Sequence, residues 1–380
     1  MIVATATWAA GSGWSPALPL PPAGESVVAI AFADPSAREH PDRPLVQLAD
    51  AWAGKPLVGC SATGQVSDGR ALDDAVVVVT LQFDSTTVRC AHADLARSGS
   101  TRRAGRELAE AVAEPGLAAV LVLVDGLSVN GTALAEGIAD VLPDVPVAGG
   151  LAADGAQFAN TWTIVDGELL EGYATAVGFI GNDVEIGFGS GSGWQPFGPD
   201  RVVTRSFGNV LYELDGGPAS ELYLQYLGDG SDALPAAGWT LPLAVTDLDG
   251  RSVLRAARAA HPMEGSLTFT GDVPQGSTVQ LARATVDGLV NAAEIAAKQA
   301  STGREQIAIA IGSAGRQTFL GEHSEHELDA MAAVLAPGAR LIGFYGFGEI
   351  APSDGCNDVH DLTMTIVTIG ERSPATAEEA

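Results

Sequence analysis

Apolar and polar positions along this chain predict strands and helices in turn. Continuous apolar runs, such as Val76–Val79 and Val120–Val124, are typical of strands that are buried on both faces of a sheet. Amphipathic runs over about 42–53, 130–142 and 324–336 place apolar side chains on one helical face. Together these patterns predict an α/β fold in which helices cover mixed sheets.

Each amphipathic run is followed by a short apolar strand and a glycine-rich turn. The three segments read LVGCSATGQV at 57–66, VPVAGGLAAD at 145–154 and LIGFYGFGEI at 341–350. The first and third segments align without a gap, so that Gly59 matches Gly343. This internal similarity indicates that the fold arose by duplication.

The order of the predicted elements divides the chain into two units. Residues 160–189 read as a meander of strands with short turns, and the segment 189–199, rich in glycine, serine and proline, follows as a loop. A second series of strands and helices comes after this loop and includes helices over 218–227 and 285–300. We therefore predict two related α/β domains of layered mixed β-sheets with outer helices, spanning residues 27–200 and 201–370.

The amino-acid composition makes some classes of binding partner unfavourable. The 380 residues include 47 acidic and 20 basic side chains, which gives a formal net charge of -27. Nucleic acids and anionic membranes are poor partners for such a chain, because they are bound largely through Lys and Arg. No apolar run reaches the roughly 18 residues of a membrane helix, and the three cysteines show no CxxC spacing. We expect a cytoplasmic protein with reduced thiols that binds neither nucleic acid nor membrane.

The glycine-rich turns are the first candidates for a ligand site. Glycine at a strand end permits a positive φ or a close approach of the backbone to a ligand, but it also serves in turns that bind nothing. Carboxylates in or near these turns suit an amino group, and backbone N–H groups in the turns suit a carboxylate, so an amino acid or another small metabolite is a plausible ligand. The candidate ligand-binding residues are Gly59, Cys60, Ser61, Gly64, Gly149, Gly150, Asp154, Trp194, Tyr345, Glu349 and His360.

Glu349, His360 and Trp194 stand out among these candidates. Glu349 interrupts an apolar strand end, and a buried carboxylate requires a hydrogen-bonded or charged partner. If the predicted strand 361–369 pairs beside 341–350, His360 lies close to Glu349, either as a structural clasp or as a ligand contact. Trp194, between glycines and a proline, is either the wall or lid of a pocket or a plug at the junction of the two units.

An enzyme is the alternative class of function. Cys60 or Ser61 could act as the nucleophile of a hydrolase or transferase if a neighbouring base activated it. No base or orienting residue is recognisable. His323 and His326 have the spacing of metal ligands but lack a third ligand. We therefore predict neither a catalytic residue nor a metal site.

Four separated motifs resemble the FIST family. They are VGCSATGQV, the segment 189–228, IGSAGRQTFLGE and GFYGFGEIAP, the last followed by His360 and Thr363. The resemblance includes both the N-terminal and the C-terminal FIST domain and covers about 27–370. It implies a sensory domain of signal transduction that binds small ligands such as amino acids.

The resemblance also bears on cofactors and partners. Some FIST relatives bind haem, sense nitric oxide and act on a partner histidine kinase, so a haem-binding sensor is one alternative for this chain. Haem would need an axial histidine in an apolar pocket, and His360 is the candidate. No output module is recognised in the sequence, so we expect the protein to act through a separate partner. A scaffold protein without a ligand would instead have no pocket between its domains.

Overall fold

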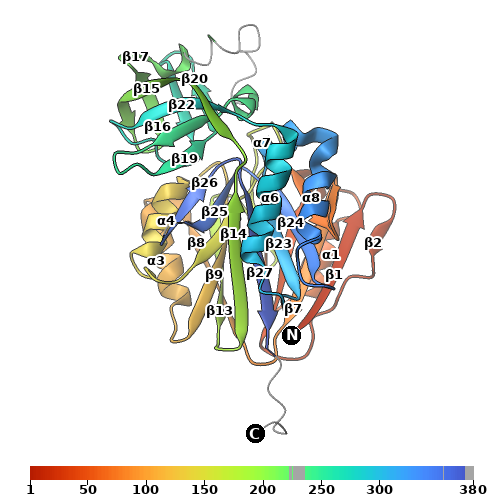
Figure 1. Ribbon diagram of the computed structural model, residues 1–380. Helices are drawn as coiled ribbons and strands as arrows, with labels where there is room; N and C mark the ends of the chain where they lie inside the picture. The colour runs from red at the N-terminus through yellow and green to blue at the C-terminus, as the bar shows by residue number, and fades with distance from the viewer. Residues whose placement is uncertain (222–224, 226–235, 354, 373–380) are drawn as a thin grey trace.

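Mixed sheets with outer helices make up most of the molecule, as predicted (Figure 1). The computed structural model describes residues 1–221, 225, 236–353 and 355–372. These described residues form four sheets, and three of the four are built around a pair of parallel strands. The parallel pairs are β3 (Val27–Ala33) with β4 (Leu57–Ser61), β9 (Leu117–Val124) with β10 (Val147–Leu151), and β23 (Ile307–Ser313) with β24 (Arg340–Gly346).

A helical crossover joins the two strands of each pair, as parallel strands require. The first sheet uses one helix, the second uses one, and the third uses two. They are α1 (Pro44–Ala51), α4 (Gly131–Ala139), and α7 (Ala314–Leu320) with α8 (Ser324–Ala332). Further helices are α2 (Leu95–Ser98), α3 (Thr101–Val112) and α6 (Val286–Ala300), and the short 3₁₀ turns are η1 (Pro35–Arg38), η3 (Ala236–Thr240) and η4 (Gly321–His323).

Each pair is extended on one side by two antiparallel strands. The first strand of the pair contacts a returning strand, and that strand contacts an outer strand. The returning strands are β7 (Ala75–Gln82), β13 (Tyr173–Ile180) and β27 (Met364–Glu371). The outer strands are β1 (Ile2–Ala9), β8 (Thr87–Asp94) and β14 (Val184–Gly191), and the short β2 (Gly13–Ser15) pairs with β1.

On the other side, each sheet receives a hairpin that follows the parallel pair of a different sheet. The hairpin β5–β6 follows β4 but pairs with β24, β25–β26 follows β24 but pairs with β10, and β11–β12 follows β10 but pairs with β4. The three sheets thus exchange hairpins in a closed cycle. The strands are β5 (Gly64–Ser67), β6 (Arg70–Leu72), β11 (Thr163–Val165), β12 (Glu168–Leu170), β25 (Gly348–Ser353) and β26 (Cys356–His360).

Backbone hydrogen bonds repeat this cycle where the sheets meet. Within the described residues, Thr63 N donates to Tyr345 O (2.9 Å), Ala153 N to Ser61 O (3.0 Å) and Phe347 N to Leu151 O (2.9 Å). The matched glycines Gly59, Gly149 and Gly343 give a common reference point in the three sheets. The three donors all lie the same number of residues after their glycine, and so do the three acceptors. The three sheets are therefore related by an approximate threefold repeat.

The apolar core lies between the sheets. Side chains from the inner faces of all three sheets form one buried cluster, in which Phe32 and Phe344 stack with ring centroids 4.5 Å apart. Separate clusters lie between each sheet and its helices, which cover the outer faces (Figure 1). A strand with both faces packed in this way needs apolar residues at every position, which explains the continuous apolar runs of the sequence.

The fourth sheet belongs to a β-rich part, residues 195–283, which we call the β-module. It is inserted between β14 and α6 and sits on one end of the three-sheet core (Figure 1). It has its own buried apolar cluster, which includes Val203, Leu243 and Phe269. Its strands are β15 (Gln195–Phe207), β16 (Val210–Leu214), β17 (Gly217–Pro218), β18 (Leu243–Thr246), β19 (Ser252–Arg255), β20 (Ala257–His261), β21 (Ser266–Phe269) and β22 (Thr278–Arg283).

The structure corrects two local predictions. The segment 189–199 is not a loop: β14 ends at Gly191, and β15 begins at Gln195 and continues through Pro196. The register of β15 against β22 shifts between Phe197 and Arg201, so this glycine- and proline-rich stretch is accommodated by an irregular strand. The helix predicted over 218–227 lies largely outside the described residues.

Candidate functional site

The matched glycines lie inside the parallel pairs. Gly59, Gly149 and Gly343 occupy equivalent positions opposite the first strand of each pair. A Cβ at any of the three would overlap a carbonyl oxygen of the facing strand, and Gly64 and Gly150 are crowded by side chains of neighbouring segments. Close packing of backbone therefore accounts for glycine at 59, 149 and 343, and contact with neighbouring side chains accounts for Gly64 and Gly150.

Cys60 and Ser61 are completely buried at the end of β4. Burial raises the pKa of the Cys60 thiol, which disfavours the thiolate that a nucleophile needs. The Ser61 hydroxyl accepts a hydrogen bond from Trp162 N at 3.2 Å. The two side chains are held within the fold and do not line a described cavity.

Asp154 and Tyr345 make contacts that hold the fold together. The Asp154 carboxylate accepts hydrogen bonds from the backbone N–H groups of Phe158, Ala159 and Asn160 at 2.7–3.0 Å, and so fixes the loop after β10. The buried Tyr345 hydroxyl donates to Glu327 Oε1 at 3.0 Å.

Two of the predicted residues, Trp194 and His360, meet at a cavity of about 500 Å³. This cavity, which we call the interface groove, runs between β14, the β-module strands β18 and β19, and the hairpin β25–β26. Its lining comes from both the three-sheet core and the β-module. The lining residues are Phe188, Gly189, Ser190, Gly191, Ser192, Trp194, Pro196, Ala244, Ser252, Val253, Leu254, Gln299, Pro352, Ser353, His360 and Thr363.

Trp194 combines both roles considered for it. It lies in the link between β14 and β15, is only 7% exposed, and packs edge-on against Phe319 with ring centroids 5.4 Å apart. It is therefore a fixed wall of the interface groove as well as part of the junction. Its indole Nε1 is buried and finds no hydrogen-bond acceptor within the described part of the chain.

Glu349 and His360 are direct partners across the hairpin β25–β26, so their predicted proximity is confirmed. The pairing strand is β26 and not the later 361–369 segment, because β27 pairs with β14 and β23. Glu349 is fully buried behind the groove, and its Oε2 accepts hydrogen bonds from Thr363 N at 3.0 Å and Thr363 Oγ1 at 2.5 Å. Burial raises the pKa of Glu349 well above its usual value, with a further contribution from nearby Asp361.

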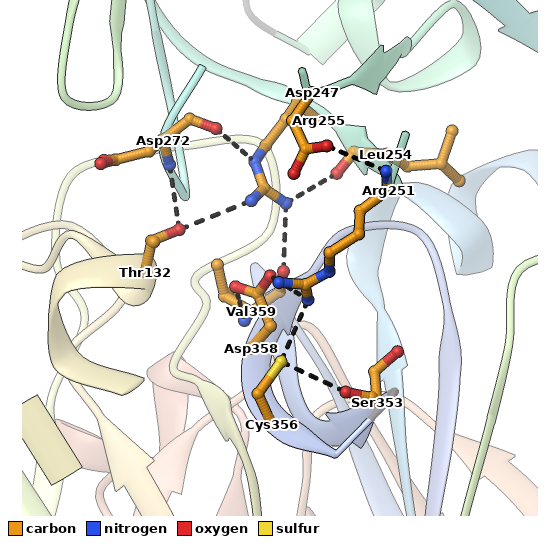
Figure 2. A network of polar contacts seen from close by, with 10 residues as sticks. All are labelled: Thr132, Asp247, Arg251, Leu254, Arg255, Asp272, Ser353, Cys356, Asp358 and Val359. Atoms are coloured by element: carbon orange, nitrogen blue, oxygen red, sulfur yellow. Dashed lines mark hydrogen bonds and ion pairs between the residues drawn. The ribbon is translucent and has the colours of Figure 1, made fainter. Parts of the chain in front are cut away.

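The β-module is held on the core by buried polar residues. These residues were not identified from the sequence. Arg255 donates to Val359 O and to Asp272 O, both at 3.0 Å, and Figure 2 shows it between the two parts. Asp361 of the core accepts hydrogen bonds from Ala256 N and Thr270 Oγ1 of the β-module. No local motif marks these residues, because their partners lie 17 to 105 positions away in the sequence.

Arg251 and Arg316 add two further contacts at the same end of the molecule. Figure 2 shows Arg251 reaching Cys356 Sγ at 3.1 Å and Asp358 Oδ2 at 3.5 Å. Arg316 is fully buried, forms an ion pair with Glu327 at 2.7 Å, and donates to Ser192 O at 2.6 Å in the link that leads to the β-module.

Comparison with known proteins identifies the family. Residues 27–217 match the FIST N domain, and residues 219–352 match the FIST C domain. The chain belongs to the FIST family. FIST domains are associated with sensory roles in signal transduction and are not a known class of enzymes.

Two proteins of similar sequence are described only as uncharacterized. An uncharacterized protein of Mycobacterium tuberculosis is 25% identical over 347 residues, which cover 87% of this chain and 88% of that protein. Another, from Methanocaldococcus jannaschii, is 27% identical over 157 residues, which cover 38% and 30%. Among solved structures, a cyanuric acid hydrolase from A. caulinodans aligns with a TM-score of 0.36 and 12% identity over 92% of this chain and 91% of that one. A TM-score this low supports no inference about activity.

The structure contains no helix, among the described residues, that is long and apolar enough to cross a membrane.

Proposed function

We propose that this FIST protein is a cytoplasmic sensor that binds a small molecule in the interface groove and signals through a separate partner, such as a histidine kinase. The observation that carries the proposal is the position of the groove, whose walls come from both the three-sheet core and the β-module. A volume of about 500 Å³ is in the range of small-molecule sites. A scaffold without a ligand would have a filled junction here.

A ligand in the interface groove would contact both parts at once. It would touch β19 of the β-module through Ser252 and Leu254, and the core hairpin through Ser353 and His360. A ligand shifts a conformational equilibrium by its difference in affinity for the two states, so a ligand that needs both walls favours the docked β-module. The partner would then recognise the docked arrangement.

A second hollow of about 670 Å³ is less suited to a sensory ligand. Its lining includes the carboxylates of Asp34, Glu39, Asp74, Asp154 and Glu171, and three of these five groups are engaged within the protein. Asp34 accepts a hydrogen bond from Ser36 N, Asp154 holds its own loop, and Glu171 pairs with Arg38. The hollow does not adjoin the β-module.

The surroundings of His360 do not fit a haem. An axial histidine for haem sits in an apolar pocket, whereas the interface groove presents the hydroxyl-bearing residues Ser190, Ser192, Ser353 and Thr363. We therefore derive no role for haem at this site.

The proposal is tested by measuring the thermal shift of the protein with each member of a metabolite panel. Calorimetry then confirms the binding of any member that gives a shift. A ligand at a hundred times its Kd stabilises the native state by about 2.7 kcal/mol. Ser353→Trp, which fills the groove from a partly exposed position, should abolish the shift while the unliganded protein stays folded. Gln157→Ala in the second hollow should leave the shift unchanged.

A stabilisation that survives in Ser353→Trp would place the ligand elsewhere and contradict the proposed site. Hydrogen exchange gives a second readout, because a bridging ligand should slow exchange in both β19 and the hairpin β25–β26.

A further inference from the structure

The interface groove carries no formal charge in its lining. Among the described residues, none of those that line it is Asp, Glu, Lys or Arg, and His360 is the one ionisable side chain in the lining. The chain as a whole has 47 acidic and 20 basic residues, and the second hollow has several carboxylates. The absence of Asp, Glu, Lys and Arg from the described lining of this groove therefore contrasts with the rest of the molecule.

The charged groups close behind the groove are already engaged. Arg316 pairs with Glu327 at 2.7 Å, and Arg251 pairs with Asp358 at 3.5 Å. Asp361 accepts hydrogen bonds from the β-module. A charged ligand would find no free countercharge in this wall, and removing a charge from water without a partner is costly.

Uncharged hydrogen-bonding groups, in contrast, are available. The side chains of Ser192, Ser353 and Gln299 line the groove and make no hydrogen bond with any described residue. Phe188 and Leu254 add apolar surface beside them. Hydroxyl and amide groups next to apolar surface suit a ligand that has polar groups on a carbon skeleton.

We propose that the interface groove selects an uncharged polar molecule, with hydroxyl, carbonyl or amide groups, over amino acids and other charged metabolites. This inference rests on the proposed function and narrows the ligand class that the family resemblance suggested. The α-ammonium and α-carboxylate of a free amino acid would both lose hydration without gaining an ionic partner.

The experiment is calorimetric titration of the full-length protein with a metabolite panel sorted by formal charge. The panel contains matched sets, namely glucose with gluconate and glucosamine, and N-acetylserinamide with serine. We expect binding by neutral members and at least about tenfold weaker binding by charged counterparts, a difference of about 1.4 kcal/mol.

Two substitutions at one position provide the matched control. Ser353→Asp introduces a charge into the groove and should weaken a neutral ligand by about tenfold or more, whereas the uncharged Ser353→Asn should change Kd by less than about threefold. The melting temperatures of the unliganded variants report whether either substitution disturbs folding.

The outcomes separate this inference from the proposed function. If charged members bind best and Ser353→Trp abolishes their binding, the site stands and the ligand class is wrong. If Ser353→Trp leaves binding intact, the site itself is wrong. A panel in which no neutral member binds at millimolar concentration also overturns the inference.

Discussion

At the scale of single residues, a few buried polar side chains hold the core together and join it to the β-module. Arg316 and Glu327 form an ion pair in which both side chains are fully buried, and Tyr345 donates a hydrogen bond to the second Glu327 oxygen. Arg316 also binds the link at Ser192. Such a pair is sensitive to the loss of one partner, because the other charge then stays buried without compensation.

Glu327→Gln is therefore expected to lower the free energy of unfolding by about 3–5 kcal/mol. Tyr345→Phe, the matched control, removes one hydrogen bond to a carboxylate and should cost about 1.5–3 kcal/mol. Denaturant titration measures both. Equal losses in the two variants would contradict a dominant role for the ion pair.

A second residue-scale prediction concerns pH. Burial raises the pKa of Asp361 to about 6, although Arg255, Thr270, Ala256 and Arg258 all act to lower it. Because the folded pKa is higher than the unfolded pKa, the stabilising contribution is complete below about pH 4 and is lost as the pH rises through about 6.

The wild-type protein should thus lose about 3 kcal/mol relative to Asp361→Asn between about pH 4 and pH 7. Unfolding free energies of both proteins across this range provide the measurement, and the difference removes contributions from other carboxyl groups. A constant difference would mean that Asp361 does not titrate in this range.

At the scale of elements, close backbone contact between parallel strands requires glycine at particular positions of the sequence. Gly59, Gly149 and Gly343 face carbonyl oxygens that a Cβ would overlap. The sequence pattern identified these glycines as special and matched Gly59 with Gly343. Their use in strand packing could be recognised only from the register of the paired strands.

Gly149→Ala should destabilise the protein by about 3 kcal/mol or more, because the overlap involves backbone that cannot move independently. Gly217→Ala is the control: Gly217 has a negative or extended φ, and its nearest atoms lie at ordinary contact distance, so the change should stay within about 0.5 kcal/mol. Thermal unfolding compares the two, and a tolerated Gly149→Ala would refute the packing argument.

The element predictions failed where local composition opposed tertiary context. Residues 189–199 have the composition of a loop, but pairing with β22 and β27 makes most of them strand. The helix α7 was not predicted, because its seven residues are too few to show a helical period. The longer α6, by contrast, was expected over 285–300 and is observed over Val286–Ala300.

At the scale of the whole molecule, the exchanged hairpins interlock the two FIST segments. Strand β5 of the N-terminal segment pairs with β24, and β25 of the C-terminal segment pairs with β10. Neither segment can complete its sheets alone. The molecule is expected to unfold as one cooperative unit apart from any separate opening of the β-module.

A fragment of residues 1–200 should accordingly fail to fold, since it exposes unpaired edges of β5 and β10. Circular dichroism and chemical-shift dispersion of the fragment, alone and mixed with 201–380, test this expectation. A fragment 1–200 that unfolds cooperatively and stays monomeric would show that the hairpin exchange is not required for folding.

The candidate site was only partly predictable. The sequence selected Trp194, Glu349 and His360 for their residue types, and the structure brings Trp194 and His360 to one groove with Glu349 behind it. It also selected Cys60, Ser61 and Tyr345, which are buried inside the sheets. Residue type and position at a strand end do not tell whether a side chain faces a cavity or a packed neighbour.

The sequence by itself determined the α/β class, most of the strands and helices, the internal repeat and the FIST family, because apolar periodicity, glycine spacing and motifs are local properties of the chain. Only the tertiary structure decided the cyclic exchange of hairpins, the docking of the β-module through Arg255 and Asp361, and the uncharged interface groove. These features depend on contacts between residues far apart in the sequence, and on which side chains lose access to water when those contacts form.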